Sequence, residues 1–310
     1  MFDVVTGGAG FIGSHLVDTL VAQGNEVLVI DSLSAGRRET IARHIDDYKV
    51  RFIQSDLLGD GWQEHIEGAD RVFHLAADPD VRQSAINPDP TMQNNIMATY
   101  RVLEAMRRHA IPELVFTSTS TVYGDAKVIP TPEDYAPMLP ISVYGASKLA
   151  CEALISSYCY SFDMKTWIFR FANIVGERSG HGVITDFIRK LKENPAELEI
   201  LGNGKQVKSY LEVHECVAAM LFALRSRDTV NIYNIGSEDW IDVRSIAEIV
   251  AEEMHLPNVK FRFTGGERGW VGDVPRMQLS IDRIKSRRWK PELGSRESVR
   301  IATCDLLKAL

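Results

Sequence analysis

The glycine-rich stretch "TGGAGFIG" at residues 6–13 limits the fold of this chain more than any other feature. The apolar "FDVV" before it predicts a strand, and "SHLVDTLVAQG" after it predicts a helix. Its glycines match G-x-G-x-x-G at Gly8, Gly10 and Gly13, and G-x-x-G-x-x-G from Gly7. A tight turn here leaves backbone N–H groups at the positive end of the helix dipole, where a pyrophosphate can bind. The sequence therefore predicts a dinucleotide-binding βαβ unit.

Strand and helix signals keep alternating beyond this unit. Strands are predicted at "EVLVID", "VRFIQSD", "RVFHLAA", "ELVFTSTS" and "TWIFRFAN", with helix-like stretches such as "NNIMATYRVLEAMRRHA" between them. After Gly176 the stretches "FIRKLKENP" and "LEILGNGKQVKSYLEV" mix helix and hairpin signals, before "ECVAAMLFALRS" and "VNIYNIG" restore the alternation. This order predicts an α/β fold with a doubly wound parallel sheet and a smaller C-terminal α/β lobe.

Domain boundaries follow from the break in this alternation. We expect the sheet domain, which would bind the dinucleotide, to span residues 1–176 and about 212–236. The substrate-binding lobe would span about 177–211 and 237–310.

Charge and hydropathy exclude several classes of function. In 310 residues, 35 Lys and Arg against 42 Asp and Glu give a net charge of −7, and no broad basic stripe is present. Nucleic acid is therefore not an expected partner. The run "KSRRWK" at 285–290 is interpreted as a solvated helix end rather than a polyanion patch. No uncharged apolar run reaches membrane-spanning length and no signal-peptide pattern is visible, so neither a membrane nor a secreted location is expected.

The cysteine spacing indicates a compartment, and the histidine spacing bears on a metal site. The scattered cysteines form no C-x-x-C pair, which predicts reduced thiols in the cytoplasm; they are Cys151, Cys159, Cys216 and Cys304. The stretch "HECVA" from His214 begins like the zinc motif H-E-x-x-H but ends in Ala218, so no metal site is expected.

Two aspartates end the second and third predicted strands. Asp31 is placed to accept hydrogen bonds from both hydroxyls of an adenosine ribose, and its charge would repel a 2′-phosphate, which favours NAD over NADP. We expect Arg37 and Arg38, which follow, to face solvent. Asp56, with Leu57 beside it, either borders the adenine or simply ends its strand.

Small residues and hydroxyls follow two later strands. Ala76 and Ala77 would let a cofactor pass close to the backbone, and "STSTVYG" brings hydroxyls to the sheet edge where doubly wound folds bind ligands. Tyr144 and Lys148 share one face of a predicted helix in "VYGASKLACEAL". Alone, this pair is a half-buried tyrosine beside a snorkelling lysine. With the hydroxyls at the same edge, it becomes a candidate base with its cation.

These motifs together resemble the extended short-chain dehydrogenase/reductase family, which has a Rossmann fold, and most closely its UDP-glucose 4-epimerase branch. The resemblance is carried, in order along nearly the whole chain, by "TGGAGFIGSHLVD", "DSLSAGRRE", "HLAA", "STSTVYG", "YGASK", "RFANIVG" and "YNIG". It implies NAD as cofactor and a UDP-hexose as substrate. The implied reaction is epimerisation at C4 through a transient 4-keto intermediate, most directly between UDP-glucose and UDP-galactose.

The resemblance also implies the site residues. Thr119, Tyr144 and Lys148 would be catalytic. The residues implied to contact NAD are Gly7, Gly10, Phe11, Ile12, Gly13, Asp31, Ser32, Asp56, Leu57, Leu75, Ala76, Ala77, Asn95, Tyr144, Lys148 and Phe171. Those implied to contact substrate are Arg82, Thr119, Ser120, Asn173, Val183, Lys208, Arg268 and Asp273.

Physical chemistry supports the catalytic roles. A tyrosine has an ordinary pKa of about 10, so a tyrosine base working near neutrality needs nearby positive charge. Lys148 and a positively charged nicotinamide would supply two cations, and lowering the pKa by about three units corresponds to roughly 4 kcal/mol. Tyr144 would then remove a sugar hydroxyl proton while a hydride leaves the same carbon for NAD, with Thr119 holding the oxygen.

The basic residues assigned to the diphosphate depart from the family pattern. Lys208 stands where the family has an arginine, which keeps the charge but loses the two-pronged guanidinium. Arg268 is the candidate for a second arginine, and it lies five residues before Asp273, separated by the unusual "GWV". Arg82 either faces a substrate phosphate or makes a surface ion pair.

Several alternatives stay open at the level of sequence. The substrate of an epimerase could be another UDP-sugar, an N-acetylhexosamine or a uronate, and a 4,6-dehydratase or decarboxylase would share the first oxidation. A non-catalytic NAD-binding scaffold subunit is the alternative from another class. Apolar helices containing Leu103 and Met106, and Leu149, Leu154 and Tyr158, predict a homodimer through paired helices, or deep burial within one monomer.

Overall fold

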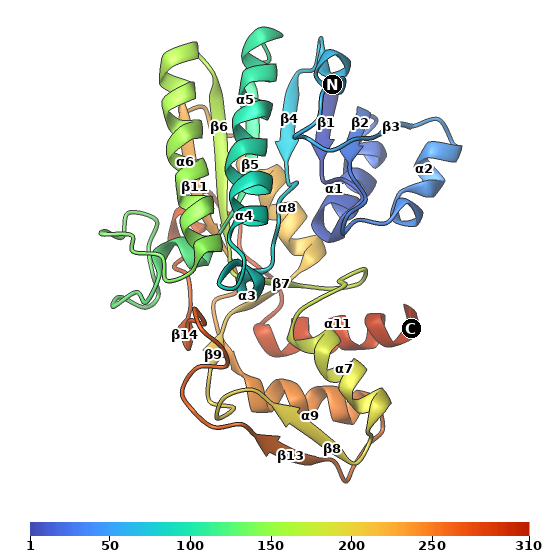
Figure 1. Cartoon of the computed structure of the whole chain (residues 1–310), viewed down its shortest axis with the longest axis vertical. Coiled ribbons are helices and arrows are strands. Elements are labelled where there is room, and N and C mark those ends of the chain that lie inside the picture. Colours follow the sequence, from blue (N-terminus) through green and yellow to red (C-terminus); the bar gives the residue numbers. More distant parts are fainter. Residues whose placement is uncertain (310) are drawn as a thin grey trace. The chain divides into compact units, whose positions relative to one another are not determined.

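The computed structural model describes residues 1–309 and divides them into two compact units (Figure 1). The first unit comprises residues 1–122, 143–170 and 220–233, and the second contains 123–142, 171–219 and the described residues from 234 onward. Residues 123–142, which the sequence grouped with the sheet domain, belong here to the second unit. The predicted end of the lobe, residue 310, lies outside the described residues.

A seven-stranded sheet forms the centre of the first unit, in the order β11-β6-β5-β4-β1-β2-β3. Its strands are β1 (Phe2–Thr6), β2 (Glu26–Asp31), β3 (Val50–Gln54), β4 (Arg71–His74), β5 (Glu113–Thr119), β6 (Lys165–Phe171) and β11 (Val230–Ile235). β1 pairs in parallel with β2 and β4, β2 with β3, and β4 with β5. The strand order reverses between β1 and β4, so the predicted doubly wound parallel sheet is confirmed.

Helices connect these strands. Those of the first unit are α1 (Phe11–Ala22), α2 (Ala42–Asp46), α3 (Val81–Ser84), α4 (Asp89–Thr91), α5 (Ala98–Arg108) and α6 (Val143–Phe162), and α8 (Val213–Ala223) begins in the second unit. Short 3₁₀ turns lie at η1 (Arg38–Thr40), η2 (Gln63–Ile66) and η4 (Ser120–Tyr123). A π-helical turn, η3 (Met92–Met97), leads into α5, where the sequence predicted one continuous helix. Figure 1 shows α5 and α6 side by side, and these two helices are in contact.

The period-two alternation of the strands divides the core of the first unit. Val4 and Leu28 pack in one cluster with Leu103 of α5 and Ile155 of α6, while Val5 is equally buried outside that cluster. Burying each such side chain contributes about 1.5–3 kcal/mol. The dimer prediction was based partly on Leu103 and Met106. Both are fully buried and face the sheet of their own unit, so they are core residues of that unit.

The second unit is the predicted smaller α/β lobe. Its strands are β7 (Asn173–Val175), β8 (Glu197–Ile200), β9 (Val207–Lys208), β10 (Tyr210–Glu212), β12 (Ile241–Asp242), β13 (Lys260–Phe263) and β14 (Arg276–Met277). Its helices are α7 (Val183–Glu193), α9 (Val243–Glu253), α10 (Asp282–Lys285) and α11 (Ser295–Ala309). α7, α9 and α11 enclose a core that includes Phe187, Leu198 and Val250.

The mixed helix and hairpin signals of residues 198–213 correspond to three short strands whose partners in the sheets are distant in the chain. β8 pairs in parallel with β13, and β9 pairs antiparallel with β12 and in parallel with β14. Leu198 and Ile200 are fully buried in the core of the lobe, so packing against distant segments selects their strand partners.

None of the helices within residues 1–309 combines the length and the apolar character needed to cross a membrane.

Candidate functional site

The glycine turn after β1 has no room for side chains. Gly7 adopts φ +71°, and a Cβ there would lie 2.7 Å from the backbone nitrogen of Ala76. A Cβ on Gly13 would lie 2.2 Å from the carbonyl oxygen of Gly7. Helix α1 begins directly after Gly10, and no side chain caps it, so its first N–H groups are left for a ligand. Phe11 and Ile12, predicted to contact NAD, form this first turn.

Asp31 ends β2 and holds this glycine turn in place. Its carboxylate accepts a hydrogen bond of 3.0 Å from the backbone N–H of Ala9 and one of 2.8 Å from that of Leu33. A carboxylate has about four lone-pair sites, so acceptor capacity remains for ribose hydroxyls. Ser32, the next predicted residue, is exposed and donates to Ser34 Oγ at 3.0 Å.

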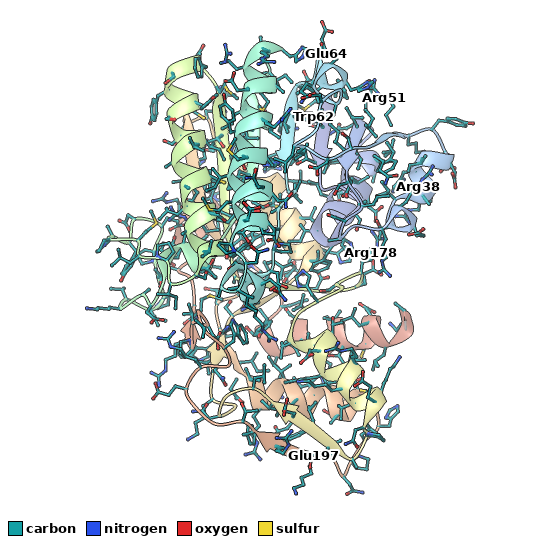
Figure 2. All side chains as sticks on the ribbon, in the orientation of Figure 1. Arg38, Arg51, Trp62, Glu64, Arg178 and Glu197 are labelled. Carbon is teal, nitrogen blue, oxygen red and sulfur yellow. The ribbon has the colours of Figure 1, made fainter. Side chains whose placement is uncertain are left out.

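The neighbouring arginines face outward, as predicted. Arg37 and Arg38 are exposed, and the Arg38 guanidinium lies 5.8 Å from the centre of the Phe52 ring. Figure 2 shows Arg38 at the margin of the first unit. Of these charged groups, the carboxylate of Asp31 is the one that bonds to the glycine turn.

The remaining predicted adenine-side residues follow β3 and β4. Asp56 is exposed and accepts from the backbone N–H of Leu58 at 2.9 Å, which is the geometry of a strand-ending aspartate turn. Leu57 is buried. Leu75, Ala76 and Ala77 are partly buried after β4; Leu75 and Ala76 lie next to the position that a Cβ on Gly7 would take.

Tyr144 and Thr119 are brought together. A hydrogen bond joins the Thr119 side chain to the Tyr144 phenol. Burial, and then the Asp78 carboxylate, raises the pKa of Tyr144 to about 12, and the Thr119 bond opposes this. The lowered pKa expected from Lys148 and a nicotinamide together stays a prediction, and burial and the Asp78 carboxylate act in the opposite direction. Ser120, the other predicted hydroxyl, is partly buried in η4.

Lys148 is buried among apolar groups. Its Nζ donates to the backbone carbonyl oxygen of Thr117 at 2.9 Å and lies 4.7 Å from the centre of the Phe116 ring. Burial lowers the pKa of Lys148 to about 8, against the opposing effects of Cys151 and Glu152. The lysine is thus an ammonium near neutrality that loses its proton under mildly alkaline conditions.

Asn95 connects the π-helical turn to α6. Its amide oxygen accepts from the backbone N–H of Asp78 at 2.8 Å, and its amide nitrogen donates to Ser147 Oγ at 2.9 Å. The widened turn of η3 places this side chain between the segment after β4 and the helix of Tyr144. Sequence reasoning predicted Asn95 but missed Asp78, although its "AADPD" context follows a strand at the edge where ligands bind.

Arg82 lies on the short helix α3, next to the site. It is exposed, while Ser84 on the same helix is buried and accepts from the backbone N–H of Tyr144 at 3.3 Å. This bond ties α3 to the start of α6. 

A buried ion pair next to the site escaped sequence reasoning. Arg170 donates to both carboxylate oxygens of Glu152, with its closest contact at 2.6 Å, and both side chains are almost fully buried. Ser118 Oγ donates to the same carboxylate at 2.5 Å. A charged residue inside the apolar strand "TWIFRF" was the signal available, because a buried arginine requires a partner.

The substrate candidates of the second unit gather around Asp273. Lys208 Nζ pairs with its carboxylate at 2.6 Å and lies 5.1 Å from the Trp270 ring centre, while Arg268 donates to its backbone carbonyl oxygen. Arg268 also makes a two-pronged ion pair with Asp125, at 3.3 and 2.5 Å. Lys208 and Arg268, which the sequence paired as diphosphate ligands, therefore belong to one cluster of side chains around Asp273.

Three other predicted residues belong to the second unit. Asn173 opens β7 and donates from Nδ2 to the carbonyl oxygen of Ser209 at 3.1 Å, next to Lys208 in the chain. Val183 opens α7 and packs against the core of the lobe. Phe171 is buried at the end of β6.

The residues of the first unit fit a bound dinucleotide. A turn that excludes side chains, an uncapped helix start and a carboxylate at the end of β2 supply the contacts for a pyrophosphate and a ribose.

The comparisons with known proteins agree with this donor set. The chain matches the NAD-dependent epimerase/dehydratase family over residues 4–236. A protein of Methanocaldococcus jannaschii, provisionally named UDP-glucose 4-epimerase, is 33% identical over 304 residues, which are 96% of this chain and 95% of that protein.

Two solved structures are similar over 100% of both chains. A UDP-galactose 4-epimerase gives a TM-score of 0.90 at 44% identity. A UDP-glucuronic acid 4-epimerase of Bacillus cereus, solved with UDP-glucuronic acid and NAD, gives a TM-score of 0.90 at 26% identity. These proteins are all named as 4-epimerases, but they differ in the sugar.

Proposed function

This chain belongs to the NAD-dependent epimerase/dehydratase family, and on that premise we propose that it inverts C4 of a UDP-hexose, interconverting UDP-glucose and UDP-galactose. The coarser assignment is an NAD-dependent enzyme that epimerises a UDP-sugar. The observation that carries inversion at C4, rather than elimination, is the end of β5 and the turn after it, where Thr119, Ser120 and Thr121 offer hydroxyls and no carboxyl group.

The proposed roles follow from the geometry of the first unit. Tyr144 is the base that takes the proton of the 4-hydroxyl, and Thr119, already bonded to the phenol, holds the same oxygen. Lys148 is a fixed cation that favours the phenolate. When bound, NAD accepts and returns the hydride and adds a positive charge, which is the kind of charge that a tyrosine with a raised pKa requires.

The hydroxyls at the end of β5 favour epimerisation over elimination. Removal of water from a 4-keto sugar needs an acid for the leaving hydroxyl and a base for the proton beside the ketone, and related dehydratases carry an Asp-Glu pair after the threonine. Ser120 and Thr121 do not titrate near neutral pH. A ketone formed here would therefore return to an alcohol.

Residues of the second unit are proposed to bind the nucleotide diphosphate. Lys208 and Arg268 supply cations, Asn173 supplies an amide, and Asp273 positions both cations. Val183 would contribute an apolar contact at the start of α7.

The test is to incubate the purified enzyme with UDP-galactose, follow UDP-glucose by chromatography and record the absorbance of reduced cofactor. We expect UDP-glucose without stoichiometric NADH. A 4-keto-6-deoxy sugar formed from UDP-galactose, or a pentose formed from UDP-glucuronic acid in a parallel incubation, would contradict epimerisation. Inversion of a UDP-N-acetylhexosamine or UDP-uronate, with no reaction of UDP-galactose, would contradict the substrate alone. Absence of reaction with UDP-galactose, a UDP-N-acetylhexosamine and a UDP-uronate, in a protein that holds NAD, would favour the scaffold alternative.

A homodimer through α5 and α6 is the proposed assembly. Tyr100 of α5 and Tyr160 and Phe162 of α6 are large apolar side chains with 42%, 74% and 47% of their surface exposed. Light scattering should give twice the monomer mass for the wild-type protein. The double variant Tyr160→Glu, Phe162→Glu should give the monomer mass.

A reducing, cytoplasmic location is also proposed. All four cysteines are free thiols, and three of them are buried. Fluorescence from a tagged chain in its host would locate it.

A further inference from the structure

Successive residues at the end of β5 each hold a residue of α6. The carbonyl oxygen of Thr117 accepts from Lys148 Nζ at 2.9 Å. Ser118 Oγ donates to Glu152 Oε1 at 2.5 Å. One bond uses the backbone of β5 and the other a side chain, and both end on α6, so the strand and the helix cannot slide past each other without breaking both.

The third residue, Thr119, bonds to the phenol of Tyr144. Tyr144, Lys148 and Glu152 are spaced by four residues and therefore form a single stripe along α6. The first two members of this stripe have roles in the proposed chemistry. Glu152 has none, although it is held at least as firmly.

Glu152 is anchored from β6, the strand next to β5. Its side chain is 5% exposed and that of Arg170 is 2% exposed, and three hydrogen bonds of 2.6 to 3.2 Å join them. Desolvating two charges costs several kcal/mol, and apolar residues of similar volume often give equal stability. Stability alone is therefore a weak reason for an ion pair at this position.

The charges that face Lys148 indicate what Glu152 does there. From β4, His74 is buried between Thr6 and Thr99, and burial lowers its pKa to about 3, so it is neutral. From α6, burial raises the pKa of the Cys151 thiol, which is therefore also neutral. 

On the same stripe, the Tyr144 phenol has a raised pKa and carries no charge near neutrality. Arg170 of β6 adds a positive charge. Glu152 is thus the negative group in this set, and it favours the charged form of Lys148.

We propose that Glu152 is a positioning residue for the reaction: anchored by Arg170 and Ser118, it fixes the register of α6 on β5 and supplies the counter-charge that Lys148 needs to act on Tyr144. The effect on turnover rests on the proposed function, whereas the effect on Lys148 does not.

The first test reads Lys148 directly. Enzyme carrying its NAD is labelled with ¹³C at the lysine ε-carbons, the Lys148 signal is assigned by its loss in Lys148→Met, and its titration midpoint is measured by NMR. In Glu152→Gln we expect the midpoint to fall by on the order of one pH unit. An unchanged midpoint in folded Glu152→Gln overturns the proposal.

The second test separates positioning from stability. Ser118→Ala keeps the ion pair but removes one anchor, so kcat should fall about tenfold while KM for the sugar nucleotide changes by less than about twofold. This variant decides the matter if Glu152→Gln does not fold, because a wild-type kcat in Ser118→Ala overturns the proposal.

Asp3 and Arg71 provide the matched control. They form another buried ion pair of the same sheet, with contacts of 3.0 and 3.1 Å, at the amino ends of β1 and β4. Asp3→Asn should lower stability but keep both the Lys148 midpoint and kcat. If Asp3→Asn loses as much kcat per folded molecule as Glu152→Gln does, a specific role for Glu152 is overturned. If the wild-type enzyme inverts no sugar nucleotide, the proposed function fails, and the Lys148 titration still decides this inference.

Discussion

Lys148 donates a hydrogen bond of 2.9 Å from Nζ to the backbone carbonyl oxygen of Thr117, two residues before Thr119 on β5. The lysine is therefore tied to the strand that also carries the hydroxyl partner of Tyr144. Burial lowers the pKa of Lys148 to about 8, while burial and Asp78 raise that of Tyr144 to about 12. Further positive charge is needed to make Tyr144 a base near neutrality, and a nicotinamide ring would bring it.

Tyr144→Phe should fold and keep its cofactor but lose about a hundredfold or more in kcat, because it removes a positioned base. The measurement is steady-state turnover together with cofactor content. Tyr158→Phe is the control on the same helix, since Tyr158 bonds to Glu104 at 2.8 Å away from the proposed chemistry. Wild-type turnover in Tyr144→Phe would make the tyrosine and Lys148 a structural pair.

Lys148→Met should change how stability depends on pH. The pKa of Lys148 falls from 10.5 to about 8 on folding, so the native state binds this proton less tightly than the unfolded chain. The resulting destabilisation is present below about pH 8 and disappears as the pH approaches 10.5. Relative to Lys148→Met, the wild-type free energy of unfolding should therefore rise across this window, by up to about 3 kcal/mol.

Urea unfolding at a series of pH values measures this difference. Lys165→Met is the control. Lys165 is the first residue of β6 and lies 4.6 Å from the centre of the Trp167 ring, so this substitution should leave the wild-type pH dependence of stability unchanged. Parallel curves for wild type and Lys148→Met would show that the buried ammonium carries no such penalty.

Asp31→Asn should narrow the preference for NAD over NADP by at least about tenfold, because it removes the charge that repels a 2′-phosphate. Titration of cofactor-stripped protein with both dinucleotides gives the ratio. Glu39→Gln, an exposed carboxylate in η1, controls for general charge in this region and should keep the ratio. Tighter binding of NADP than NAD by the wild-type protein would remove the role assigned to Asp31.

Lys208→Ala should weaken the binding of UDP about tenfold or more and leave NAD affinity unchanged, because a cation assigned to the diphosphate is lost. Lys208→Arg should bind UDP at least as tightly as the wild type, since a guanidinium can contact phosphate with two N–H groups. Isothermal titration measures both affinities.

Arg262→Ala is the control for this pair of variants. Arg262 pairs with Glu197, labelled in Figure 2, and with Glu199 on the surface of the same unit. Equal UDP affinity in Lys208→Ala and Arg262→Ala would show that Lys208 serves only its ion pair with Asp273.

The candidate site was predictable where its residues act through local geometry. Gly7, Gly13 and Asp31 occupy a single strand-turn-helix-strand unit, and their spacing alone predicts a turn that no side chain can enter. Tyr144 and Thr119 were nominated from separate motifs, and the structure joins them by a hydrogen bond. Their pKa values could not be predicted, because burial depends on everything packed around them.

The sequence by itself determined the alternation of strands and helices, the dinucleotide turn and the stripe of Tyr144 and Lys148, because these follow from backbone sterics and from periodicities of two and 3.6 residues. Only the tertiary structure decided the partner of β8, the acceptor of Lys148 and the burial of Glu152 with Arg170. β8 and β13 are some 60 residues apart in the chain, and Glu152 and Arg170 are 18 apart on different elements. Such contacts form because the folded core brings these segments together and removes water from between them, and no spacing within either segment encodes that.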